Sequence, residues 1–185
     1  IKCEEDQQHR TAAPKKQRGS RTHVFTCTLP KSNDTVTTQM TIPHFIIIGA
    51  QKGGTSSLGK ILDQHPSLVK SKTFEPHFFD LSIHKLVSQL TPQDLCKLRQ
   101  SYSSHFPREA LHQLLLDHGN NFSQGKNHTP ILLFEKTPSY IVYSKIPDAI
   151  AKILFWKPKI LVTLRNPVDR AFSQYKMARQ NQQDY

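Results

Sequence analysis

A glycine-rich segment carries residues suited to binding an anion. Lys52 is followed by Gly53 and Gly54, and then by the hydroxyls of Thr55 and Ser56. Glycines let a backbone wrap closely around a phosphate, and the free N–H groups at a helix N-terminus attract negative charge. A turn that served only packing would not need the lysine and both hydroxyls as well. The segment therefore predicts a loop that binds a phosphate or sulfate group.

The order of these residues differs from that of the common ATP-binding loop. In a Walker A motif the lysine follows the last glycine, whereas Lys52 precedes Gly53 and Gly54. A P-loop nucleotide kinase or NTPase stays an alternative, because the carboxylate Glu135 follows an apolar run. A non-catalytic anion-binding module is a second alternative, since 25 lysines and arginines against 14 acidic residues give a net charge of +11.

Apolar runs and turn residues predict the elements that position this loop. Buried strands are predicted at residues 45–48, 68–70, 131–134 and 160–164. Helices are predicted over residues 55–65, from Thr91-Pro92 onward, over about 107–117, and from Pro167 to about 180. Strands that alternate with helices indicate an α/β fold, a P-loop-like parallel sheet flanked by helices.

The composition divides the chain into two parts. Residues 1–41 are rich in lysine, glutamine, threonine and serine with little periodicity, which predicts a disordered tail or stem. Residues 42–185 form the predicted domain, and we expect a C-terminal portion of it to be missing because only one helix follows the last strand. No apolar run reaches the roughly 20 residues of a membrane span. The alternative of a membrane anchor upstream of this sequence stays open.

Several short blocks, in a fixed order, resemble the sulfotransferase family, and its heparan sulfate branch in particular. They are IGAQKGGT at residues 48–55, His65-Pro66, EPHFFD at residues 75–80, EKTPSY at residues 135–140 and RNPVDR at residues 165–170. The resemblance extends over about residues 43–182. It implies a sulfotransferase that uses the donor 3′-phosphoadenylyl sulfate (PAPS), releases PAP and needs no metal.

The same resemblance implies which residues bind the donor. Lys52, Gly53, Gly54, Thr55 and Ser56 would hold its 5′-phosphosulfate, and Arg165 and Ser173 its 3′-phosphate. A guanidinium can grip a phosphate with two parallel hydrogen bonds. Ser173 lies about 9 Å along the helix that Pro167 begins, at 1.5 Å per residue, which would let it share that phosphate.

The resemblance also implies the catalytic residues. Glu75 would act as the general base that takes a proton from the acceptor, while Lys52 and Lys136 stabilise the charge that develops during transfer. His77, with Asp80, would orient Glu75 or the acceptor. The implied acceptor is a hydroxyl or amine of a carbohydrate, an anionic polysaccharide such as a heparan sulfate-like glycosaminoglycan, and not a nucleic acid.

Cysteines and glycosylation sequons bear on the compartment. The three cysteines, Cys3, Cys27 and Cys96, form no CxxC pair, which argues against structural zinc and leaves the redox state open. Sequons at Asn33, Asn121 and Asn127 would permit a secreted glycoprotein. Together with the resemblance, they predict the Golgi lumen, with a type II membrane anchor that is absent from this sequence.

Overall fold

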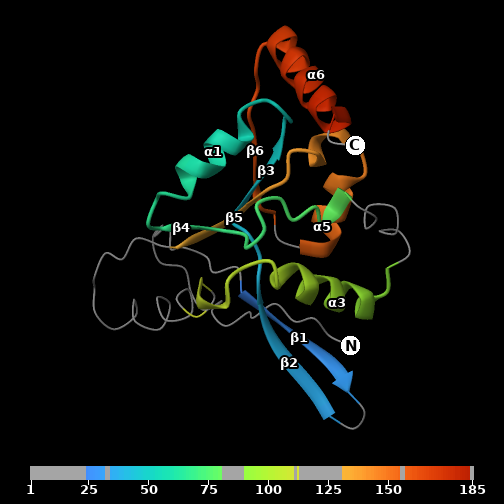
Figure 1. Cartoon of the computed structure of the whole chain (residues 1–185). Coiled ribbons are helices and arrows are strands. Elements are labelled where there is room, and N and C mark those ends of the chain that lie inside the picture. Colours follow the sequence, from blue (N-terminus) through green and yellow to red (C-terminus); the bar gives the residue numbers. More distant parts are fainter. Residues whose placement is uncertain are drawn as a thin grey trace, which may run out of the picture.

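The structure is a computed structural model that describes residues 24–31, 34–80, 90–110, 112, 131–154 and 157–183. Its centre is a parallel sheet of four strands in the order β4-β5-β3-β6. The strands are β3 (Phe45–Gly49), β4 (Leu68–Lys70), β5 (Leu132–Lys136) and β6 (Lys159–Val162). All three neighbouring pairs run parallel, which confirms the predicted α/β sheet (Figure 1). The glycine-rich loop leaves β3, which lies between β5 and β6.

Four helices and one 3₁₀ turn have defined bounds in the described parts of the chain. They are α1 (Thr55–Leu62), α3 (Pro92–Ser103), η3 (Tyr140–Val142), α5 (Ile146–Leu154) and α6 (Pro167–Gln183). The prediction that a helix begins at Thr91-Pro92 is confirmed, because Thr91 and Asp94 form a reciprocal capping box. The helix predicted over about 107–117 falls largely outside the described residues.

The two faces of the sheet are covered differently. In β5, Leu133 is part of the main core cluster with residues of α3 and α5, while the Lys136 side chain approaches α1 on the opposite face. Figure 1 shows α1 and α5 on opposite sides of the strands. Buried Arg99 of α3 joins the two helices of the core face, since its guanidinium donates to the carbonyls of Ile153 and Lys152 at the end of α5.

Part of the range predicted as a tail forms a hairpin. β1 (Val24–Lys31) and β2 (Asp34–Thr41) pair antiparallel, with Val24 opposite Thr41, and both contact α3. The structure therefore differs from the predicted tail over these two strands. The segment is rich in threonine and valine, whose branched side chains favour strands, although threonine also contributes to a polar composition. Residues 1–23 lie outside the described residues.

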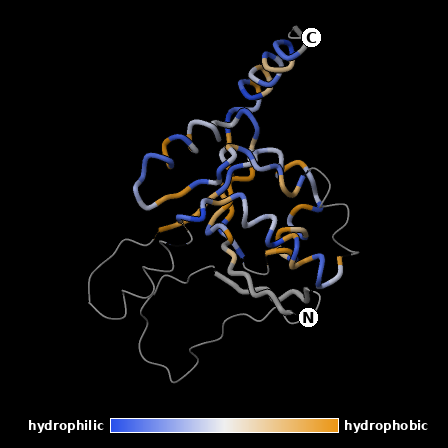
Figure 2. Tube along the Cα trace, turned by 60° about the horizontal axis from the view of Figure 1, so that its bottom comes forward, coloured by the Kyte–Doolittle hydropathy of each residue, from blue (hydrophilic) through white to orange (hydrophobic). Residues whose placement is uncertain are grey.

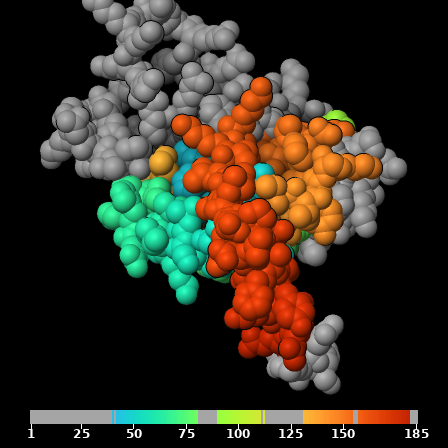
Figure 3. Space-filling model, turned by 90° about the horizontal axis from the view of Figure 1, so that it is seen from above, coloured from blue at the N-terminus to red at the C-terminus, as the bar shows by residue number. Residues whose placement is uncertain are grey.

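The last strand, the last helix and the connection between them expose apolar side chains, so the strand predicted over residues 160–164 forms as β6 but is not buried as expected. These side chains are Ile160, Val162, Leu164, Val168, Phe172 and Tyr175. In contrast to the apolar strands at the centre, α6 is mostly hydrophilic and extends away from the body of the molecule (Figures 2 and 3). No helix in the described ranges is both long enough and apolar enough to cross a membrane.

Candidate active site

The glycines of the loop are required by its local geometry. A Cβ atom at Gly53 would lie 2.7 Å from the Thr163 carbonyl oxygen and 2.8 Å from that of Ala50. Gly54 has a φ of 95°, a left-handed conformation that strains any residue with a side chain. Backbone hydrogen bonds from Ala50 to Thr163 (2.9 Å) and from Thr163 to Gly49 (2.8 Å) fix the loop against the end of β6.

Helix α1 begins directly after this loop with free backbone donors. No side chain caps its N-terminus, and a backbone bond of 3.0 Å runs from the Leu58 N–H to the Gly54 carbonyl. The N–H groups of Thr55, Ser56 and Ser57 therefore lie ahead of the first turn's hydrogen bonds. Such donors, at the positive end of the helix dipole, fit the phosphosulfate group predicted for this loop.

Lys136 links the glycine-rich loop to the predicted base. Its side chain is almost fully buried at the end of β5, and Nζ forms an ion pair with Oε1 of Glu75. The same Nζ lies 3.4 Å from Oγ of Ser56 and 3.7 Å from the centre of the Phe74 ring. The lysine thus places a carboxylate beside the first turn of α1.

His77 extends this cluster toward a second carboxylate. Its Nε2 lies 3.3 Å from Oε2 of Glu75, and its Nδ1 lies 2.9 Å from Oδ2 of Asp80. Ser139 Oγ donates a hydrogen bond to the same Asp80 oxygen. Both nitrogens of the His77 ring therefore face carboxylate oxygens, and the two oxygens of Glu75 contact His77 and Lys136 respectively.

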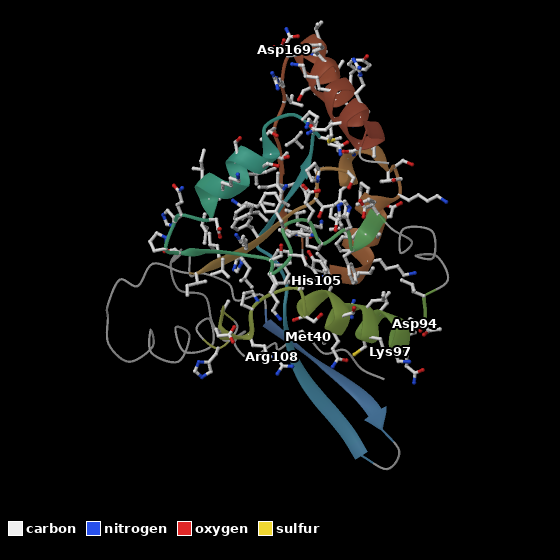
Figure 4. The ribbon with its side chains drawn as sticks, in the orientation of Figure 1. Met40, Asp94, Lys97, His105, Arg108 and Asp169 are labelled. Atoms are coloured by element: carbon white, nitrogen blue, oxygen red, sulfur yellow. The ribbon has the colours of Figure 1, made fainter. Side chains whose placement is uncertain are left out.

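The structure does not bring the remaining predicted residues into this cluster. Lys52 Nζ instead contacts Met177 Sδ of α6 at 3.6 Å. Arg165 is exposed after β6, and Ser173 is half-buried in α6. Across the described ranges, neither a hydrogen bond nor an ion pair joins Arg165 to Ser173 or Lys52 to Glu75. Figure 4 shows Asp169, in the first turn of α6, far above Asp94 and Lys97 of α3 in that view.

Glu135 does not take the place expected in a nucleotide kinase. It precedes Lys136 in β5, so its side chain points to the opposite face of the sheet. There it is fully buried and accepts a hydrogen bond of 2.6 Å from the Tyr102 hydroxyl. Burial raises the pKa of Glu135 to about 8. A carboxyl in this environment is unsuited to hold magnesium next to the loop.

Two further residues contact the segment that carries Glu75 and His77. Ser139 binds Asp80, and the Tyr140 hydroxyl accepts hydrogen bonds from the backbone N–H groups of Phe78 and Phe79. In the sequence, Ser139 and Tyr140 stand out only as members of the EKTPSY block, which predicts no separate role for either. Their position in the sequence, three and four residues after Lys136, is the feature that could have indicated a place near the site.

Comparison with known proteins agrees with the geometry. Residues 43–185 match the sulfotransferase family. Heparan sulfate glucosamine 3-O-sulfotransferase 3B1 of Mus musculus is 34% identical over 72% of this chain and 26% of its own length. The 3A1 enzyme of Homo sapiens is 33% identical, over 72% of this chain and 25% of its own. The chain thus spans about a quarter of the length of these curated relatives. It belongs to the sulfotransferase family, and the resemblance to the heparan sulfate branch is confirmed.

Proposed function

We propose that this chain carries the donor-binding and catalytic part of an enzyme that transfers a sulfuryl group from PAPS to a glycosaminoglycan. The observation that supports this most is the contact of buried Lys136 with both Glu75 and Ser56. It joins a carboxylate to the N-terminus of α1, where an anionic donor group fits. The P-loop kinase alternative is not favoured.

The proposed reaction is an in-line displacement at sulfur. Glu75 takes the proton of the acceptor hydroxyl while the oxygen of that hydroxyl forms a bond to sulfur. The bond from sulfur to the bridging phosphate oxygen breaks, and PAP leaves with that oxygen. Lys136, together with Lys52, stabilises the negative charge on the bridging and sulfuryl oxygens, while His77 holds Glu75 in orientation. Bound PAPS supplies the sulfuryl group.

Binding of the donor is proposed to use two groups of residues. The loop from Lys52 to Ser56 would hold the 5′-phosphosulfate through backbone N–H groups, the lysine and the hydroxyls. Arg165 and Ser173 would hold the 3′-phosphate. Both are accessible enough to meet a ligand, because Arg165 is exposed and Ser173 is half-buried.

The proposed acceptor is a heparan sulfate-like chain. The named relatives act on a glucosamine 3-O position, so a sugar hydroxyl is preferred over an amine. A net charge of +11 favours association with an anionic polysaccharide.

The proposed location is the Golgi lumen, with a type II anchor upstream of this sequence. Cys96 is disulfide-bonded, and disulfides persist in oxidising compartments such as the secretory pathway. The sequons at Asn33, Asn121 and Asn127 fit the same compartment.

Ligand-dependent melting tests the donor assignment. PAP should raise the melting temperature of this chain in EDTA, because a ligand that binds only the folded state stabilises it. Mg-ATP at the same concentration should cause a smaller shift. Stabilisation by Mg-ATP and none by PAP would contradict a sulfotransferase. A shift that follows only the charge of any polyanion and disappears in salt would instead indicate an anion-binding module.

A further inference from the structure

The backbone of the loop that carries Glu75 and His77 is held by one side chain. The N–H groups of Phe78 and Phe79 both donate to the hydroxyl of Tyr140, at 3.0 and 3.3 Å. These bonds join residues 62 and 61 positions apart, and Tyr140 is 1% exposed. Buried N–H groups cost free energy when they lack a partner, so this hydroxyl replaces the hydrogen bonds that a strand or helix would supply.

These two hydrogen bonds lie directly next to the predicted catalytic residues in the chain, where the backbone is strained. His77, directly before Phe78, has a φ of 53°, in the left-handed region that non-glycine residues seldom occupy. Such a conformation persists where surrounding contacts fix the chain. Tyr140 supplies two of those contacts on one side of His77, and the ion pair of Glu75 with Lys136 supplies one on the other.

Tyr140 itself is held firmly in the core. Its ring packs edge-on against Phe79, with ring centres 5.5 Å apart, and its N–H donates to the Thr137 carbonyl at 3.1 Å. The hydroxyl lies beside Glu135, whose carboxyl also binds the Tyr102 hydroxyl on the core face of the sheet. Burial raises the pKa of Tyr140 well above the ordinary value, so the hydroxyl keeps its proton.

One short segment therefore holds the loop at three places. Lys136 pairs with Glu75, Ser139 donates to Asp80, and Tyr140 accepts from Phe78 and Phe79. Since Lys136 and Tyr140 are four residues apart at the end of β5, the distance between them is fixed by local structure. That local structure sets where Glu75 stands relative to Lys136.

We propose that Tyr140 is a positioning residue, whose hydroxyl holds the loop of residues 75–80 so that Glu75 and His77 meet Lys136 beside the donor loop. Tyr140 touches neither donor nor acceptor in this role and acts through the backbone of Phe78 and Phe79. Its catalytic consequence rests on the proposed function, whereas the tether itself is independent of that function.

The variant Tyr140→Phe tests the proposal, because it keeps the ring and removes only the hydroxyl. Hydrogen exchange of the Phe78 and Phe79 amides should become at least roughly tenfold faster than in the wild type. Transfer from PAPS should show a kcat lower by about 10- to 100-fold, as expected when a catalytic group is displaced, with the KM for PAPS unchanged. The concentration of folded protein is measured by PAP binding and used to calculate kcat, so that a loss of folded protein does not lower the kcat obtained.

Tyr175→Phe is the matched control, since it removes the same atom from an exposed tyrosine on α6. It should leave both the exchange of these two amides and kcat unchanged. Unaltered amide exchange and unaltered kcat in Tyr140→Phe would overturn the proposal. If that variant does not fold, exchange in the wild type decides, because unprotected Phe78 and Phe79 amides contradict the tether. Absence of transfer by the wild type would contradict the proposed function and leave the exchange result standing.

Discussion

Replacement of Glu135 by glutamine should change how stability depends on pH. Burial raises the pKa of Glu135 from 4.5 to about 8, against smaller opposing effects of the Tyr102 and Tyr140 hydroxyls. Because the folded state holds the proton more tightly than the unfolded state, protonation of Glu135 stabilises the fold. This stabilising contribution to the free energy of unfolding is fully present below pH 4.5. It is lost as pH rises toward 8, at about 1.4 kcal/mol per pH unit and about 5 kcal/mol in total.

The assay is urea unfolding at pH 5, 6, 7 and 8, with the free energy of unfolding obtained by linear extrapolation. Glutamine cannot ionise and can still accept the Tyr102 hydrogen bond through its amide oxygen. The difference between Glu135→Gln and wild type should therefore grow in favour of the variant as pH rises. Glu109→Gln, an exposed glutamate, is the control and should show no such trend. A difference that stays constant from pH 5 to 8 would refute the reasoning.

Two further predictions follow from the described contacts. Burial lowers the pKa of His44 from 6.5 to about 4, so wild type should lose stability as pH falls from 6.5 to 4. The variant His44→Gln can still accept the hydrogen bond from the Leu133 N–H, and its free energy of unfolding should fall less over this pH range. An equal fall in wild type and variant, measured by urea unfolding, would contradict this. Gly53→Ala should weaken PAP binding at least roughly tenfold in calorimetry, because its Cβ would collide with two carbonyl oxygens. Unchanged PAP affinity would show that this backbone can shift freely.

Much of the sheet could be predicted, because buried parallel strands leave uninterrupted apolar runs. The run at 45–48 is β3, and Pro167 marks the beginning of α6. Helix α5 was not predicted, although its buried residues follow a helical spacing, at Ile146, Ala149, Ile150, Ile153 and Leu154. Pro147 interrupts that pattern in the sequence, yet proline is tolerated in the first turn of a helix.

The candidate site was predictable as a set of residues but less so as an arrangement. Glu75, His77 and Lys136 were expected to act together, and the structure places them in contact. The hydrogen bonds from the Phe78 and Phe79 N–H groups to the Tyr140 hydroxyl could not be predicted, because backbone N–H groups leave no signature in a sequence. The contact of Lys52 with Met177 depends on the direction of α6, a largely polar helix with no described residue in the main core cluster.

Transfer of radiolabelled sulfate from PAPS to heparan sulfate by a Glu75→Gln variant tests the central claim most directly. It should be measured in this chain and in a form extended beyond Tyr185, with PAP-induced melting of each protein as the control for donor binding. Loss of the base should lower transfer by about 100-fold or more, while the PAP-induced shift stays nearly the same as in wild type. Full transfer by Glu75→Gln would contradict the assignment of Glu75 as the general base.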